Sequence, residues 1–132
     1  MDRWVRIFAL DATCPPETLL PGAELGHEDG AWFWAELDGV RVERFLADEE
    51  GIRAELNAWA AIVEETVDQP ATLMEYIVQS QQLFTLSGPD EAAWKLALSL
   101  AQATRGIIQK DEGGWHDSDG TLLAGSEDDD GG

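Results

Sequence analysis

The chain has 132 residues, of which 27 are Asp or Glu and only 8 are Lys or Arg, so its formal net charge is −19. A surface this negative repels nucleic acid, anionic membranes and anionic substrates, and none of these is an expected partner. The same charge accelerates encounter with a basic protein or a cation. The length is typical of one domain, and a hydrophobic fraction of 44% is enough for a core.

Most of the negative charge belongs to the body of the chain. The last nine residues hold four acids, and subtracting these four from −19 leaves −15. We therefore expect one α+β domain over residues 1–123 and a disordered acidic tail over residues 124–132. The single Cys14 cannot form an intramolecular disulfide, and it reads as a buried or incidental thiol. With no leader segment and no long apolar run, the sequence predicts a cytoplasmic protein.

The first elements are a strand and a long loop. Residues 3–10 are rich in aromatic and β-branched residues, which favours a strand. Residues 11–30 contain several Pro and Gly and the acidic pair Glu28 and Asp29, which predicts a loop. In a compact domain a loop of this length is either functional or mobile.

Residues 31–46 give the clearest local signal, because two β-rich runs are joined by Asp38 and Gly39. This dipeptide favours a two-residue type I′ hairpin. The predicted core face pairs Leu37 with Val40, Ala35 with Val42 and Phe33 with Arg44. The predicted opposite face pairs Glu36 with Arg41, Trp34 with Glu43 and Trp32 with Phe45.

Two helices are expected next, with one ambiguous segment between them. Asp48 can cap a helix whose apolar stripe runs from Ile52 to Val67 at helical spacing. Residues 71–86 are compatible with a long strand, with two strands or with a helix followed by a strand, and their β-rich runs favour strand. Ser87 or Gly88 can cap the second helix, which is expected to end near residue 104.

Residues 106–110 are expected to return as a strand, and residues 114–123 to form a short hairpin. The whole pattern predicts an α+β fold with an antiparallel or mixed sheet of about five to six strands. Two helices are expected to pack on one face of that sheet, in a ferredoxin-like arrangement.

Residues that could carry catalysis or bind a metal are few. His27 lies beside Glu28 and Asp29, and His116 beside Asp117, and imidazole with carboxylate can ligate divalent cations. A solvated turn is the favoured interpretation of the His27 cluster. For the His116 cluster a hairpin turn built from Asp and Gly is favoured, because the run lacks the ligand spacing of a calcium loop. The sequence therefore predicts no cofactor and no catalytic residue, with His27, His116 and Asp117 as weak metal candidates.

An interface is the stronger interpretation. Trp32, Trp34 and Phe45 are predicted on one sheet face beside Glu36 and Glu43, which combines aromatic anchors with surrounding charge. With two helices expected, a face that is covered by a helix, which makes these residues part of the core, is slightly favoured over an exposed face. In that case the surface for a partner would come from the acidic loop with Glu28 and Asp29 and from the acidic pairs Glu64-Glu65 and Asp111-Glu112.

The order of elements after residue 71 carries a family resemblance. The expected order begins with a strand over residues 82–86, the run Ser87-Gly88-Pro89-Asp90-Glu91 and an Ala-rich helix. It continues with residues 103–109 and ends with the run Trp115-His116-Asp117-Ser118-Asp119-Gly120. This order resembles small bacterial α+β proteins among the immunity proteins of polymorphic toxin systems. The resemblance covers residues 71–123 and implies an intracellular inhibitor, monomeric or homodimeric, that covers the active site of a toxin, often a basic nuclease. No binding residue of that family carries over to this chain.

These observations together favour a non-enzymatic acidic domain that binds a basic protein, with an immunity or inhibitor protein as the specific form. Electrostatic steering would bring the partner in before an aromatic patch docks on it. The alternative from another class is a small metal-dependent or hydrolytic enzyme that uses His27, His116 and nearby carboxylates.

Overall fold

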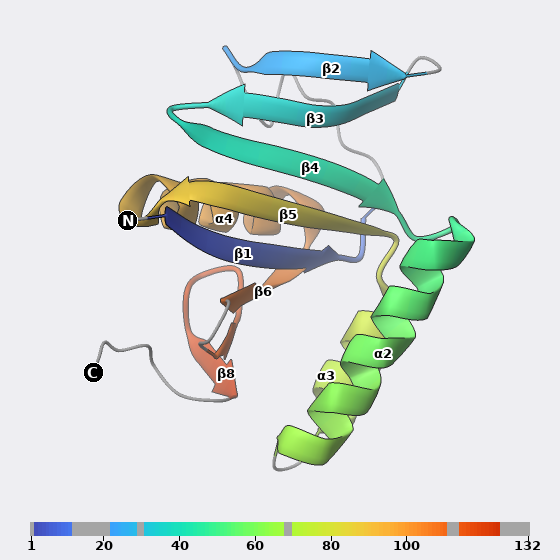
Figure 1. Cartoon of the computed structure of the whole chain (residues 1–132). Helices are drawn as coiled ribbons and strands as arrows, with labels where there is room; N and C mark the ends of the chain where they lie inside the picture. The colour runs from blue at the N-terminus through green and yellow to red at the C-terminus, as the bar shows by residue number, and fades with distance from the viewer. Residues whose placement is uncertain (1, 12–21, 29–30, 68–69, 111–113, 125–132) are drawn as a thin grey trace.

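The computed structural model describes residues 2–11, 22–28, 31–67, 70–110 and 114–124. These residues form three helices and one sheet of eight strands, shown in Figure 1. The strands are β1 (Asp2–Ala9), β2 (Glu24–Glu28), β3 (Ala31–Leu37), β4 (Val40–Leu46), β5 (Gln82–Pro89), β6 (Gly106–Lys110), β7 (Trp115–His116) and β8 (Leu122–Ala124). The helices are α2 (Glu50–Thr66), α3 (Ala71–Gln79) and α4 (Asp90–Thr104).

The strand order in the sheet is β2-β3-β4-β5-β1-β6-β7-β8, and each adjacent pair is antiparallel. Because β5 and β6 both run antiparallel to β1, they are parallel to each other, and α4 connects them in a split β-α-β unit. The predicted α+β class with an antiparallel sheet is confirmed. The predicted five to six strands and two helices on one face are wrong, since the described residues contain eight strands and three helices.

Helix α4 covers one face of the sheet, behind it in Figure 1. Small residues of α4, among them Ala93, Ala97 and Ala101, are fully buried against the sheet. They pack on β-branched and aromatic residues of the central strands, including Ile7 and Phe84. The small alanine side chains allow the helix to approach the sheet closely, so α4 alone covers the middle of this face.

Helices α2 and α3 form a hairpin that packs on the other face, at one end of the sheet. Leu56 and Val63 of α2 and Ile77 of α3 are fully buried in a second cluster. Its sheet residues are Phe8, Leu83, Ile107 and Trp115. The helices therefore lie on both faces, because the hairpin inserted between β4 and β5 folds back over the face that α4 does not reach.

The β3–β4 hairpin turns at Asp38 and Gly39, whose φ angles are 54° and 80°, as a type I′ turn requires. The register confirms the predicted pairs from Leu37 with Val40 to Trp34 with Glu43. The predicted pairs of Phe33 with Arg44 and of Trp32 with Phe45 are absent from the described register, which ends at Trp34 and Glu43, while β4 continues to pair with β5 through Leu46.

Phe33 is also misplaced by the sequence prediction, which put it on the core face. The β2–β3 register shifts between Gly26 and His27, and Phe33 is the extra residue of this β-bulge. A bulge interrupts the alternation of side chains between the two faces, and Phe33 is 41% exposed.

Residues 71–79, predicted as strand, form helix α3. Leu73 and Ile77 lie four residues apart and are both buried against α2, which is the spacing of a helix face. The alternative of a helix followed by a strand is therefore the correct one, because β5 begins at Gln82. Packing against α2 outweighs the β-propensity of the Tyr76-Ile77-Val78 run.

The predicted helix caps are also corrected. Helix α2 follows Glu49 rather than Asp48, and α4 follows Pro89, and neither start has a side-chain cap hydrogen bond. Ser87 and Gly88 belong to β5, because the sheet register with β1 extends through Pro89.

The predicted loop and the predicted tail both have different bounds in the structure. Part of the expected loop over residues 11–30 is strand β2, whereas residues 12–21, 29 and 30 lie outside the described residues. Ala124 belongs to β8, and the rest of the expected tail, residues 125–132, also lies outside them. In the described part of the chain, no helix has the length and hydropathy needed to span a membrane.

Candidate functional site

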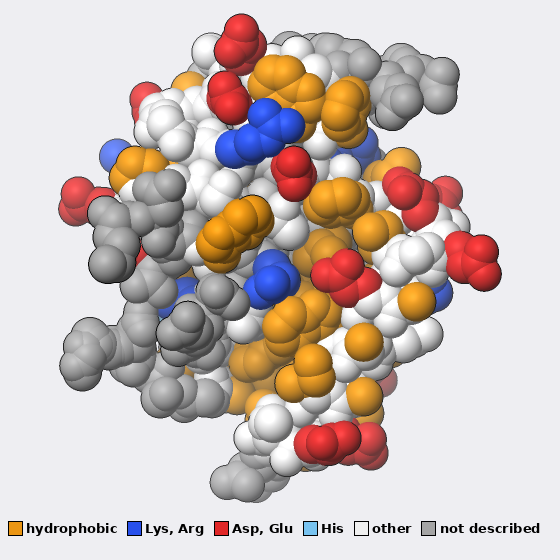
Figure 2. All heavy atoms as spheres, viewed as in Figure 1, with side chains coloured by type: hydrophobic (Ala, Val, Ile, Leu, Met, Phe, Trp, Pro, Cys, Tyr) orange, Lys and Arg blue, Asp and Glu red, His pale blue; other side chains and the backbone are white. Residues whose placement is uncertain are grey.

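The sheet face opposite α4 is turned toward the viewer in Figure 1 and carries two rows of side chains. The described helices leave these rows uncovered except at Arg6, which contacts Trp59 of α2. Residues directly opposite each other in antiparallel strands share a face, so the strand registers define the rows. One row runs Glu24, Glu36, Arg41, Ser87, Trp4, and the next runs Gly26, Trp34, Glu43, Thr85, Arg6. We call these ten residues the open face. Figure 2 shows acidic, basic and hydrophobic side chains mixed on this side of the molecule.

Trp34 is held in place from two sides. A Cβ atom on Gly26 would lie 1.8 Å from Nε1 of Trp34, so the indole rests directly on the backbone of β2. The guanidinium of Arg41 lies 4.8 Å from the centre of the Trp34 ring, in cation–π contact. The indole is therefore fixed before any partner arrives, which lowers the entropy that binding would cost.

Arg41 also bridges two carboxylates on the open face. Its Nη1 donates to Oε2 of Glu36 and its Nε donates to Oε2 of Glu43, each at 3.4 Å. All three side chains are more than 40% exposed, so each ion pair is weak. The positive charge of Arg41 is thereby balanced within the face.

Glu24 and Glu36 lie directly opposite each other on β2 and β3, and both are exposed. Like charges at this position destabilise a sheet. A cation that approached this edge of the open face would relieve the repulsion.

Trp4 extends the aromatic surface toward the middle of the sheet. It is 50% exposed, and Ser87 separates it from Arg41 along the first row. Arg6, in the second row, stacks on Trp59 of α2 at 4.8 Å and donates a hydrogen bond to Gln109. The open face thus ends where α2 begins to cover the sheet.

The structure brings together four of the predicted interface residues. Trp34, Glu36 and Glu43 belong to the open face, and half-buried Phe45 lies at its border with the α2–α3 cluster. The backbones of Glu28 and Trp32 lie in β2 and β3, but their side chains are outside the description, as is the whole of Asp29. The alternative of a face covered by a helix holds for Phe45, which packs against the α2–α3 cluster, whereas Trp34 belongs to neither buried cluster of the described residues.

The metal candidates are not brought together. His27 lies on β2 and His116 on β7, six strand spacings apart, which is roughly 29 Å. His116 is buried beneath α4, with its ring 5.2 Å from that of Trp94. Asp117 accepts a hydrogen bond from the backbone of Ser118 in the following turn. Among the described residues, no group of three His, Cys, Asp or Glu is placed to hold a metal ion.

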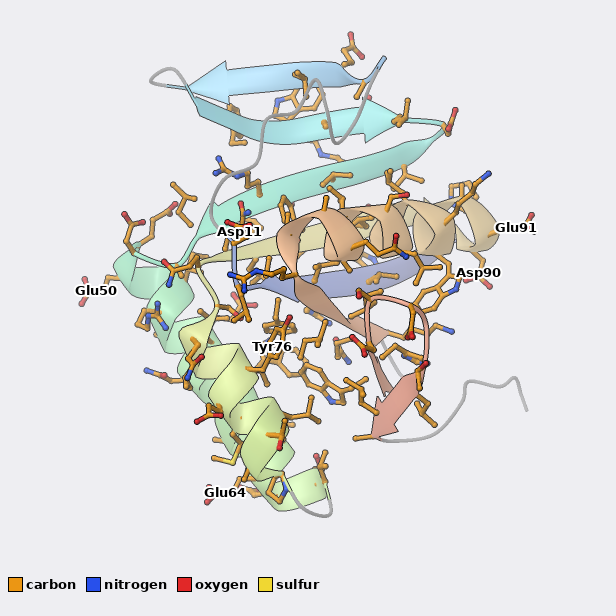
Figure 3. All side chains as sticks on the ribbon, turned by 180° about the vertical axis from the view of Figure 1, so that it is seen from behind. Asp11, Glu50, Glu64, Tyr76, Asp90 and Glu91 are labelled. Carbon is orange, nitrogen blue, oxygen red and sulfur yellow. The ribbon has the colours of Figure 1, made fainter. Side chains whose placement is uncertain are left out.

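Two described groups with shifted pKa lie away from the open face, and Tyr76 is labelled in Figure 3. Burial, and to a lesser extent the negative charge of Asp117, raises the pKa of Tyr76, whose hydroxyl donates to the carbonyl oxygen of Arg105. Hydrogen bonds from Thr121 lower the pKa of Asp119 in the β7–β8 turn. Each shift has a local structural cause, and Tyr76 and Asp119 do not form an acid–base pair.

A groove of about 570 Å³ lies on the opposite side, between α4 and the β3–β4 turn. Asp38 and Glu91 line it beside Lys95, with Leu37 and Leu96 among its apolar residues. Its carboxylates are thus partly balanced by a lysine.

The sequence prediction missed Trp4, Gly26 and the central position of Arg41. Trp4 joins the open face only because β1 is inserted between β5 and β6, which pairs residues more than 80 positions apart. The small size of Gly26 was the available signal for a close approach, but its partner Trp34 depends on the pairing of β2.

Comparisons with models of known protein families, with curated proteins and with solved structures found no match.

Proposed function

We propose that this chain is a non-enzymatic acidic domain that binds a basic protein, and specifically an immunity or inhibitor protein that neutralises a toxin. The observation that carries the proposal is the open face, where Trp34 and Trp4 stand among Glu24, Glu36 and Glu43 without a covering helix. Aromatic residues at the centre of an exposed patch, with charged residues around them, are typical of binding hot spots.

The charge distribution supports a basic partner. Both arginines of the open face are engaged within the chain, Arg41 by Glu36 and Glu43, and Arg6 by Trp59 and Gln109. The carboxylates are more numerous than these arginines, and the whole chain carries −19. Such a field raises the rate at which a basic protein encounters the domain, and wrong acidic partners are repelled.

Inhibition in this scheme needs no chemistry from the chain. Steering brings the basic partner to the acidic surface, and the aromatic surface of Trp34 and Trp4 then packs against that partner. A rigid sheet face that lies across a basic active site excludes its substrate. Because Trp34 is already held by Gly26 and Arg41, its side chain loses little conformational entropy on binding.

Co-expression tests the proposal. The product of the gene next to the one that encodes this chain is expressed alone and together with the chain, and cell growth is measured. We expect growth arrest by the neighbour alone, protection by the chain, and loss of protection with Trp34→Ala. Ile62→Ala is the matched control, because Ile62 is also exposed but lies on α2.

The purified pair gives the physical readout. Association should slow by at least about tenfold between low and high salt, as expected for steered encounter. An association rate that does not change with salt contradicts steering, and a neighbouring gene whose product neither arrests growth nor binds the chain contradicts the proposed inhibitor.

A further inference from the structure

Strands β3 and β4 fork apart at one end of the open face. β4 pairs with β3 from Val40 to Glu43, whereas it pairs with β5 from Arg41 to Leu46. The bulge at Phe33 turns β3 away at the point where the β3–β4 pairing ends. Figure 1 shows the two strands diverging toward the start of α2.

A pocket of about 300 Å³ lies in this fork. Its aromatic residues are Phe33, which is 41% exposed, and half-buried Phe45. The charged residues that line it are Arg41, Glu43, Arg44 and Glu49. The pocket therefore combines two phenyl rings with two carboxylates and two guanidinium groups.

The guanidinium groups are already engaged. Arg44 donates from Nε to Oε1 of Gln82 at 2.7 Å, a short hydrogen bond. Arg41 is shared between Glu36, Glu43 and the ring of Trp34. The donors that line the pocket thus point to partners within the chain.

The carboxylates are less well satisfied. Oε2 of Glu43 accepts from Arg41 at 3.4 Å, and Oε2 of Glu49 accepts from the backbone of Leu46 at 3.4 Å. Both distances are at the long limit for a hydrogen bond, and an ionised carboxylate has about four acceptor positions. The carboxylates of the pocket can therefore accept further hydrogen bonds from a ligand, and the chain's charge of −19 favours a ligand whose donor group is positively charged.

We propose that the fork pocket receives one arginine side chain. This inference rests on the proposed function for the origin of that arginine, which is the basic partner protein. The aliphatic part of the side chain would lie between Phe33 and Phe45, and the guanidinium would donate to Glu43 and Glu49. Arginine fits better than lysine, because its planar group stacks on aromatic rings and binds carboxylates through two parallel hydrogen bonds.

A small-molecule titration tests the pocket without the partner. N-acetyl-arginine amide is added to the full chain at low salt, and the NMR signals of the Phe33 and Phe45 rings are followed. We expect saturable changes at both rings with a dissociation constant in the millimolar range, roughly that of a weak fragment. N-acetyl-citrulline amide has nearly the same shape without the charge and should bind at least about tenfold more weakly.

Substitutions separate the pocket from general attraction by the acidic chain. Glu43→Gln and Glu49→Gln should each weaken the arginine amide by about tenfold. Glu64→Gln makes the same charge change near the far end of α2, which Figure 3 labels, and should leave binding unchanged. Equal binding of citrulline and arginine amides, tighter binding of N-acetyl-glutamate amide, or equal weakening by Glu64→Gln overturns the inference.

The two proposals can fail separately. If the arginine amide does not bind but protection of cells still requires Trp34, the pocket inference is wrong and the proposed function stands. If the arginine amide binds as expected but the neighbouring gene's product does not interact with the chain, the pocket stands and the inhibitor function is wrong.

Discussion

Trp34 occupies the space that a side chain on Gly26 would need, with 1.8 Å between its Nε1 and the position of a Cβ atom. The Gly26→Ala variant should therefore displace the indole and lower the free energy of unfolding by about 1–3 kcal/mol, as overpacking does. Urea unfolding measures the change. Gly51→Ala is the control: its Cβ has no atom within 4 Å and lies in α2, where alanine should stabilise by up to about 1 kcal/mol.

Arg41 separates carboxylates that would otherwise repel each other across the strands. Arg41→Gln should lower the free energy of unfolding by about 0.5–1 kcal/mol at low salt, because two exposed ion pairs are lost. The difference from the native chain should shrink in about 1 M salt, which screens exposed charges. A difference that is the same at both salt concentrations would show that Arg41 acts through packing on Trp34.

Tyr76 links α3 to the end of α4 through its hydrogen bond to the carbonyl oxygen of Arg105. Tyr76→Phe should cost about 1 kcal/mol of unfolding free energy. Because folding raises the pKa of Tyr76, this stabilisation is fully present below the unfolded pKa of about 10 and is lost as pH rises through the folded pKa. Tyr76 is the only tyrosine, so ultraviolet absorbance reports its ionisation directly. A midpoint at or below 10 would contradict the burial of the hydroxyl.

The β7–β8 turn depends on the carboxylate of Asp119, which accepts a hydrogen bond from the backbone of Thr121 at 2.9 Å. NMR titration of this carboxyl should give a midpoint below the ordinary value of 3.8. Thr121→Ala removes the side-chain hydrogen bond and keeps the backbone one, so the midpoint should rise only part of the way. Since folding lowers the pKa of Asp119, this carboxylate stabilises the turn fully above the ordinary pKa of 3.8, and the stabilisation is lost as pH falls through the folded pKa.

Local signals predicted the elements whose contacts are close in the sequence. Asp38 and Gly39 adopt the positive φ angles that their residue types favour, and the register of the hairpin follows from that turn. The stripe of α2 was predicted because Leu56 and Val63 recur at helical spacing on one buried side. In these segments the intrinsic preference of the residues, the spacing of the apolar residues and the packing in the structure all favour the same element.

Long-range packing decided the segments that were mispredicted. The run from Glu24 to Glu28 has weak β-propensity and becomes a strand because β3 offers a pairing edge. Ala71–Gln79 becomes a helix because α2 covers its buried side. For the same reason the aromatic and acidic character of the open face was predictable from β3 and β4, whereas the contribution of Trp4 depends on the order of distant strands.

The position of β1 between β5 and β6 has a consequence for how the chain is made. Ile7 pairs with Phe84 on one side and with Ile108 on the other, so β1 has no pairing partner until β5, more than 70 residues further along the chain, has been made. The β2–β3–β4 ribbon and the α2–α3 hairpin can form earlier, from neighbouring residues. During synthesis the apolar residues of β1 therefore wait longer for their pairing partners than those of the ribbon or the helical hairpin, and an unpaired apolar strand is prone to aggregate.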